Sequence, residues 1–306
     1  MERRINSLPN YKISVEDEKG DVELHFVGLF SKKENATPIV LLHGWPGSFL
    51  EFLPTLDIIR KKYETSELPF HIIVPSLPGY TLSSGPPRDK AWVGEDAARV
   101  IDTAIKKLGF DRYVVQGGDV GCLIASLLAT TYDSVIGVHL NLLPSLDQVD
   151  DNDPDLTEFE KQAIQRGNER FKPPSIGAAI MNSTRPATIG AVISSNPLAL
   201  LAWIGEKFLE WPEENVSIDD VLTDVSLYWF TDCFARCNYT YRGTFLVSPP
   251  FCLPFIDKPF GYYVEKKGRL AFYRQHEHGG HFAALERPTE FLQDTEDFME
   301  AALKEQ

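Results

Sequence analysis

Short apolar runs alternate with amphipathic stretches through the first half of the chain. The runs VELHFVGLF, PIVLLHG, FHIIVPSLPGY, DRYVVQGGD and VIGVHLNLLP lie between residues 22 and 144 and have the length and apolar character of buried strands. Helical spacing marks the segments between them, as in VGEDAARVIDTAIKKLG, which runs from Val93 to a stop at Gly109. This alternation predicts an α/β fold with a mostly parallel central sheet and helices on both faces.

The pattern changes between about Ser145 and Pro250. An acidic run, DQVDDNDPDLTEFE, precedes long helix-like stretches, LALLAWIGEKFLEW and VLTDVSLYWFTDCFARCNYTYR, with little strand signal. The sheet pattern resumes at RLAFYRQHEHGGHFAALERP, and PTEFLQDTEDFMEAALKEQ closes the chain as a helix. We therefore interpret residues 146–250 as a helical cap inserted into a core domain formed by residues 1–145 and 251–306.

Composition and charge limit the partners. The 306 residues are 43% hydrophobic and 24% charged, the balance of a globular protein with a sizeable core. A net charge of -14 and the lack of a basic cluster argue against nucleic acid or an anionic membrane as a partner. The four cysteines lie in or beside apolar runs without a CxxC pair, which predicts reduced core thiols and no metal site.

The location is predicted to be cytoplasmic. The start of the chain, MERRINSLPNYKISVEDEKGD, has no apolar region of the kind that directs secretion. The most apolar window, GAVISSNPLALLAWIG, is interrupted by Ser, Asn and Pro and is too short to span a bilayer. No membrane span is expected.

A single carboxylate interrupts the stretch VVQGGDVGCLIA. Asp119 stands between Gly118 and Val120, with glycines on both sides, where a buried strand meets a helix. Small residues around a reactive residue mark a nucleophile elbow, a turn too tight for larger side chains. A carboxylate at an elbow attacks a saturated carbon and leaves an ester on the enzyme, and the helix that opens at Val120 favours its ionised form. The alternative is an aspartate that only caps the turn.

Two further motifs supply partners for Asp119. LLHGWPGSF follows a buried strand, and the N–H groups of Trp45 and Val120 are predicted to hold the oxyanion that forms when water attacks the ester. In EHGGHFAALERP, His281 follows two glycines, and its place last in chain order suits a general base on water. The remaining histidines are interpreted as loop, surface or structural residues: His25, His43, His71, His139, His276 and His278.

The segments HGWPGSFLEF, GGDVG, NSTRPATIGAVISSNPLALLAWIGEKF and GGHFAALERP resemble the microsomal-type epoxide hydrolases of the α/β-hydrolase superfamily, particularly fungal ones. The resemblance runs from about Ile5 to the C-terminus. It implies an α/β-hydrolase fold, a small-molecule epoxide substrate, no metal or organic cofactor, and a place in fungal secondary metabolism. It also implies that Asp119 is the nucleophile, that His281 is the base, and that Tyr241 in NYTYRG is one of two cap tyrosines that bind the epoxide oxygen.

The sequence departs from this family in three places. Ala178 stands where the second cap tyrosine is expected. Phe255 stands where the family has the acid that orients the histidine, so Glu265 is the first substitute and Asp257 the second, and a third interpretation has no acid in this role. The N-terminal meander that the family carries ahead of INSLPNY is essentially absent, so part of the covering of the core domain and a dimer contact are expected to be missing, and a homodimer is one possible oligomeric state.

These departures define the alternatives to an epoxide hydrolase. One is a remodelled pathway enzyme, an epoxide-opening cyclase or isomerase, and another is a binding relic with low activity. A haloalkane dehalogenase also uses an aspartate at the elbow, but it usually has a tryptophan directly after the nucleophile, where this chain has Val120. The substrate epoxide and its stereochemistry depend on the shape of the cap.

Overall fold

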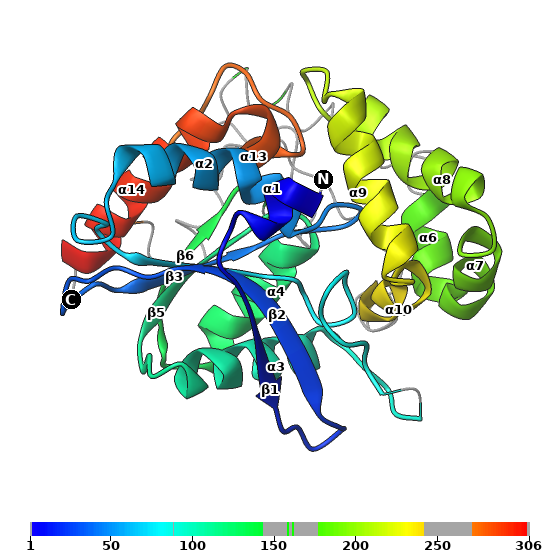
Figure 1. Cartoon of the computed structure of the whole chain (residues 1–306), viewed down its shortest axis with the longest axis horizontal. Coiled ribbons are helices and arrows are strands. Elements are labelled where there is room, and N and C mark those ends of the chain that lie inside the picture. The colour runs from blue at the N-terminus through cyan, green and yellow to red at the C-terminus, as the bar shows by residue number, and fades with distance from the viewer. Residues whose placement is uncertain are drawn as a thin grey trace.

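A six-stranded sheet lies at the centre of the molecule (Figure 1). The computed structural model describes residues 2–87, 89–142, 158, 161, 177–241 and 271–304. The strand order is β1-β2-β4-β3-β5-β6; β3, β4, β5 and β6 are parallel, and β1 and β2 form an antiparallel edge. The strands are β1 (Asn10–Val15), β2 (Val22–Leu29), β3 (Pro38–Leu42), β4 (His71–Pro75), β5 (Tyr113–Gly117) and β6 (Val135–Leu140).

Helices cover both faces of the sheet, as the pattern predicts (Figure 1). Along β3, Val40 and Leu42 belong to the cluster that includes α3 and α4, whereas Ile39 and Leu41 belong to the cluster that includes α2 and α14. Because both faces of such a strand are buried, its sequence is an uninterrupted run of apolar residues. The elements of the two faces are α1 (Glu2–Asn6), η1 (Phe49–Phe52), α2 (Leu53–Lys62), α3 (Gly94–Lys107), α4 (Val120–Thr131), α13 (Ala283–Glu286) and α14 (Pro288–Lys304).

A second group of helices, from residue 177 to residue 240, gathers at one side of the molecule, at the right in Figure 1. The predicted helical stretch 221–242 is divided here, because α9 ends at Phe230 and Asp232 adopts a φ of 49°, which a helix does not accommodate. The group consists of α6 (Gly177–Thr184), α7 (Pro186–Ile193), α8 (Pro197–Glu210), α9 (Ile218–Phe230), α10 (Phe234–Cys237) and η2 (Asn238–Thr240).

The strand predicted within RLAFYRQHEHGGHF is wrong for the part that the structure describes. Residues 271–282 have no regular structure. Their side chains, rather than backbone hydrogen bonds of a sheet, attach this segment to the core: Arg274 and His276 bind Asp294 of α14 at 2.8 and 2.6 Å. The ring of Phe272 lies 6.3 Å from that of Phe298. In the described residues, this segment therefore packs on α14 instead of adding a strand to the sheet.

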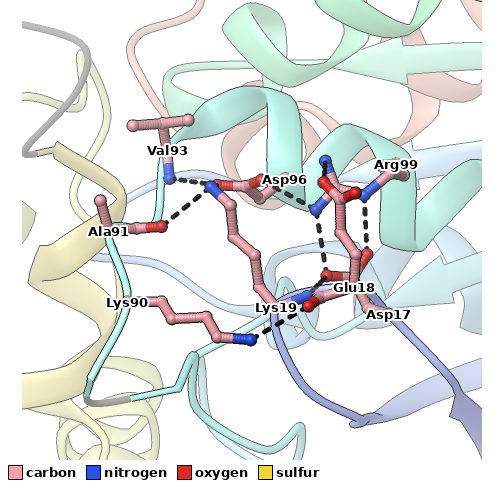
Figure 2. A network of polar contacts seen from close by, with 8 residues as sticks. All are labelled: Asp17, Glu18, Lys19, Lys90, Ala91, Val93, Asp96 and Arg99. Carbon is pink, nitrogen blue, oxygen red and sulfur yellow. Dashed lines mark hydrogen bonds and ion pairs between the residues drawn. The ribbon is translucent and has the colours of Figure 1, made fainter.

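A polar network joins the β1–β2 turn to the start of α3 (Figure 2). Arg99 donates to Asp17 through Nε at 2.7 Å and Nη2 at 3.0 Å, and to Asp96 at 2.8 Å. Lys19 donates to Asp96 at 2.7 Å, and the backbone N–H of Val93 caps the helix through the same carboxylate at 2.9 Å. The hydrogen bonds from Arg99 hold the pKa of Asp17 below its usual value.

Candidate active site

The turn between β5 and α4 raises Asp119 above the edge of the sheet. Asp119 has a φ of 50°, a conformation that non-glycine residues rarely adopt. A Cβ on Gly117 would lie 2.3 Å from the Gly121 carbonyl oxygen, and one on Gly121 would lie 2.3 Å from the Leu42 carbonyl oxygen. Only glycine therefore fits at these two positions, and the surrounding packing maintains the strained backbone at Asp119.

One carboxylate oxygen of Asp119 is held by both N–H groups that the sequence predicts. The backbone N–H groups of Trp45 and Val120 each donate to Oδ1 at 2.7 Å. The loop after β3 approaches closely because Gly44 has no side chain: a Cβ there would lie 2.3 Å from the Cβ of Asp119. This pair of donors, with the N-terminus of α4, stabilises negative charge on Oδ1.

The other oxygen faces His281. The distance from Nε2 of His281 to Oδ2 of Asp119 is 3.4 Å, and the two side chains are 11% and 14% exposed. The His281 ring packs against Trp211 and Phe282, with ring centroids 4.7 and 4.9 Å apart, and the backbone N–H of His281 donates to the Trp211 carbonyl at 3.2 Å. The structure thus brings together the predicted nucleophile and the predicted base, which lie 162 positions apart in the chain (281 − 119).

Glu286, which the sequence analysis did not single out, organises the loop around His281. Its carboxylate accepts from the backbone N–H groups of Gly280 at 3.1 Å and Phe282 at 2.8 Å, on the two sides of the histidine. It also accepts from Glu213 at 2.8 Å and Glu214 at 3.2 Å, in the connection between α8 and α9. One partly buried acid therefore ties the histidine loop to the helical group, and the sequence offers only its place in HFAALERP as a signal.

Tyr241 lies beside the elbow, as predicted. It follows η2, is buried, and its ring lies 6.0 Å from that of Trp45 at an interplanar angle of 85°. Burial first, and then the charge of Asp119, raise the pKa of its hydroxyl well above the usual value. The hydroxyl group therefore stays neutral and keeps its proton for donation.

Ala178 is a buried residue of α6 in the same apolar cluster as Tyr241. The helix α6 packs against η2, the short helix that directly precedes Tyr241. Glu265, Asp257, Phe255 and Cys252 lie outside the residues that the structure describes. Cys122, Cys233 and Cys237 are buried free thiols, as the sequence predicts.

Two further acids, Glu51 and Asp224, lie near the elbow and were missed. Asp224 of α9 is buried and accepts from the Ser48 hydroxyl at 2.5 Å. Burial raises its pKa to about 7. Glu51 is partly buried in η1, and burial together with the charges of Asp224 and Asp119 raises its pKa well above the usual value. A signal was present in SFLEF, because an acid among apolar residues is as conspicuous there as Asp119 is in its own stretch.

The described part of the chain contains no group of three or more His, Cys, Asp or Glu side chains placed to hold a metal ion. Among the same residues, no single helix has the length and hydropathy to cross a membrane; α7 and α8 meet both criteria only together, and they are bent by 115°.

Known protein families and solved structures that resemble this chain are epoxide hydrolases and α/β-hydrolases, as the geometry of the site suggests. The family described as "Epoxide hydrolase N terminus" matches residues 1–52, and the family "alpha/beta hydrolase fold" matches residues 37–160. The Aspergillus niger epoxide hydrolase structure is 43% identical, with a TM-score of 0.88 over 98% of this chain and 80% of that one.

Two further relatives, one from a fungus and one from an insect, are also similar to this chain over nearly its whole length. A protein from Dothistroma septosporum is 37% identical over 318 residues, 99% of this chain and 75% of the relative. The juvenile hormone epoxide hydrolase structure from Bombyx mori is 25% identical, with a TM-score of 0.76 over 99% of this chain and 78% of that one. The sheet predicted from the sequence is thus the α/β-hydrolase fold. The chain belongs to the epoxide hydrolase family.

Proposed function

We propose that the protein opens an epoxide to a vicinal diol through an ester on Asp119, which a water molecule activated by His281 then hydrolyses. The unequal surroundings of the two Asp119 oxygens carry this proposal. Oδ1 accepts two backbone N–H groups at 2.7 Å, whereas Oδ2 faces Nε2 of His281. Oδ2 is thus the oxygen suited to attack, and Oδ1 the one suited to carry charge in the hydrolysis step.

In the first step, Oδ2 of Asp119 attacks one epoxide carbon from the side opposite the ring oxygen. The carbon–oxygen bond breaks, its electron pair moves to the epoxide oxygen, and that oxygen takes the proton of the Tyr241 hydroxyl. Burial favours this donor because it keeps the hydroxyl protonated beside a carboxylate. The helices α6 to α10 with η2 form the cap that covers this side, and their side chains select the epoxide.

In the second step, His281 takes a proton from water, and the resulting hydroxide adds to the Asp119 ester carbon. Negative charge develops on Oδ1, where the N–H groups of Trp45 and Val120 already point. The intermediate collapses, the alkoxide leaves with the proton from His281, and the proton of the regenerated acid returns to Tyr241. The sum of both steps is epoxide plus water to diol.

The position of His281 supports hydrolysis over the alternatives. A cyclase or isomerase does not need a base beside the ester, and a binding relic does not need a strained elbow with two aligned N–H donors. The close approach of His281 to Asp119, together with the two N–H groups that donate to Asp119, supports hydrolysis. A halide site of the dehalogenase type is not favoured, because Val120 provides no side-chain N–H.

The test is to replace the base. In His281→Gln, alkylation proceeds but hydrolysis stops, so mass spectrometry after mixing with a styrene-type epoxide should show the substrate mass accumulating on the peptide that contains Asp119. Asp119→Asn is the control, because its amide is a far poorer nucleophile and forms no adduct. An adduct on another peptide, or normal ester breakdown in His281→Gln, would refute the proposal.

A further inference from the structure

A small cavity lies behind the nucleophile, between the sheet edge, η1 and α13. Its volume is about 20 Å³, and one water molecule needs about 10–15 Å³. Asp119 and His281 both line it, which places the cavity beside the two groups that must meet the hydrolytic water. Its polar lining also includes Glu51, Gln116 and Asn141.

Gln116 gives an independent sign that this cavity takes a polar molecule. Its side chain is 1% exposed, and Nε2 donates to Oδ1 of Asn141 at 3.1 Å. Its Oε1 atom is buried and has no hydrogen-bond partner among the residues that the structure describes. A buried acceptor of this kind is costly unless a water molecule satisfies it.

Glu51 is fixed on another side of the same cavity. Gly47 makes room for it: a Cβ on Gly47 would lie 1.5 Å from Oε1 of Glu51. The carboxyl group accepts backbone hydrogen bonds from Gly44 and Ser48, on both sides of the loop that carries the Trp45 N–H donor. Glu51 therefore has a defined position relative to Asp119 and is not a side chain that moves freely in solvent.

Burial first, and then the neighbouring acids, raise the pKa of Glu51 and favour its neutral form. Asp224 and Asp119 are the acids that face it, and the nearby His43 is neutral because burial lowers its pKa to about 4. A neutral carboxyl group presents one O–H donor and one carbonyl acceptor. Its carbonyl oxygen can accept a hydrogen bond from water without adding a second negative charge beside Asp119.

We propose that this cavity binds the water molecule that hydrolyses the Asp119 ester, and that Glu51 and Gln116 orient it. This inference rests on the proposed function. One water hydrogen points to Nε2 of His281, and the other is shared by the carbonyl oxygens of Glu51 and Gln116. A lone pair of the water oxygen then faces the ester carbon. As His281 takes the first proton, the new oxygen–carbon bond forms and the second proton stays on the attacking oxygen.

This arrangement separates the two reactants. Tyr241 and α6 lie on the face of the sheet edge that includes the helical group, whereas the cavity is lined by Phe52, Ala284 and Phe291 of the opposite apolar cluster. The epoxide and the water therefore reach Asp119 from different sides. Substrate binding does not have to displace the water, and the water does not compete with Asp119 for the epoxide.

Paired substitutions test the inference. Glu51→Met removes the acceptor at similar length and should slow ester hydrolysis about 10–100-fold, with alkylation changed less than about threefold. Glu51→Gln keeps a carbonyl acceptor and should restore hydrolysis to within about threefold of wild type. Gln116→Met, which does not alter a charge, should slow hydrolysis about 5–20-fold. Exposed Glu67→Met is the control and should leave both phases unchanged.

Both phases are measured by stopped-flow tryptophan fluorescence with a styrene-type epoxide, and quenched samples are analysed by mass spectrometry for the Asp119 ester. Unchanged hydrolysis in the folded Glu51→Met or Gln116→Met variants overturns the inference. Equal slowing of both phases, without rescue in Glu51→Gln, also overturns it and shows a structural role. Absence of the Asp119 ester in wild type contradicts the proposed function instead, so the two failures are distinguishable.

Discussion

Two clusters of carboxylates in this molecule have different partners: one is paired with cations, and the other is bound by neutral hydrogen-bond donors. In the network at the start of α3, each buried carboxylate meets a cation: Arg99 binds Asp17 and Asp96, and Lys19 binds Asp96 (Figure 2). Around the elbow, Asp119 and Asp224 meet backbone N–H groups and a hydroxyl, and the described residues place no lysine or arginine in an ion pair with them.

The difference shows how the groups around an acid determine its pKa, and with it whether the acid stabilises the fold or contributes to the site. Cations stabilise the charged form, lower the pKa of Asp17 and make the acid part of the scaffold. Neutral donors leave the pKa values of Asp224 and Tyr241 raised by burial, so protonated groups remain available beside the Asp119 carboxylate. In the proposed mechanism, a cation at the elbow would bind Asp119 and make its carboxylate a weaker nucleophile towards the epoxide carbon.

The largest effect among the substitutions that test this comparison is expected on the alkylation rate, when the hydroxyl group of the neutral donor Tyr241 is removed. Tyr241→Phe keeps the ring against Trp45 but removes the hydroxyl group, so alkylation should slow about 10²–10³-fold. The rate of ester formation in stopped-flow fluorescence measures this loss. Ala178→Tyr, which restores the family's second tyrosine, should recover part of it if position 178 faces the epoxide. Unchanged alkylation in Tyr241→Phe would assign the epoxide oxygen to another group.

A smaller effect is expected when the buried acid Asp224 is made neutral. Its folded-state pKa of about 7 exceeds the ordinary 3.8, so folding takes up a proton and this acid lowers stability as pH rises between these values. Asp224→Asn keeps an acceptor for Ser48 and should raise the unfolding free energy at pH 8 by about 1–3 kcal/mol, with little change below pH 4.

Urea unfolding at several pH values measures this difference. The exposed Asp219, on the same helix, provides the control, and Asp219→Asn should show no such pH dependence. Equal stability of wild type and Asp224→Asn across the range would show that Asp224 is charged without penalty, and the contrast between the two clusters would fail.

The smallest effect is expected on the unfolding free energy, when a cation is removed from the network at the start of α3. Arg99→Ala leaves Asp17 without its donor and should lower the unfolding free energy at pH 7 by about 1–2 kcal/mol. Because the folded-state pKa of Asp17 is lowered, this stabilisation is present above its ordinary value of 3.8 and is lost as pH falls through the folded-state pKa. Urea unfolding should therefore show the gap to wild type narrowing in acid.

The exposed pair of Lys12 and Glu23 is the matched control for this measurement, and Lys12→Ala should change stability by less than about 0.5 kcal/mol. A gap in Arg99→Ala that stays constant down to pH 2 would show that packing of the arginine stem, and not its charge, is what stabilises the fold.

Local sequence was sufficient to predict the parallel strands and the elbow. The five predicted runs contain β2 to β6, and the predicted helix from Val93 to Gly109 contains α3. The helix C-terminal stop is local too, since Gly109 adopts a φ of 91°. Asp119 was identifiable because glycine requirements act between neighbours in the chain.

Features that depend on distant segments were not predictable in the same way. The strand expected after residue 270 is absent from residues 271–282, where Arg274 and His276 bind Asp294 of α14, a contact that the local sequence does not reveal. Glu51 and Gln116 lie 65 positions apart (116 − 51), and only folding places them around one cavity. The acid that orients His281 stays a prediction, because Glu265 and Asp257 lie outside the described residues.

The most direct test of the central claim, an ester on Asp119, is a single turnover in water labelled with heavy oxygen and with enzyme in excess. If Oδ2 of Asp119 becomes an oxygen of the product, the first diol released carries no label, and the peptide that contains Asp119 gains one labelled oxygen. Both products are read by mass spectrometry. A labelled diol together with an unlabelled Asp119 peptide would show direct attack of water on the epoxide and would contradict the account.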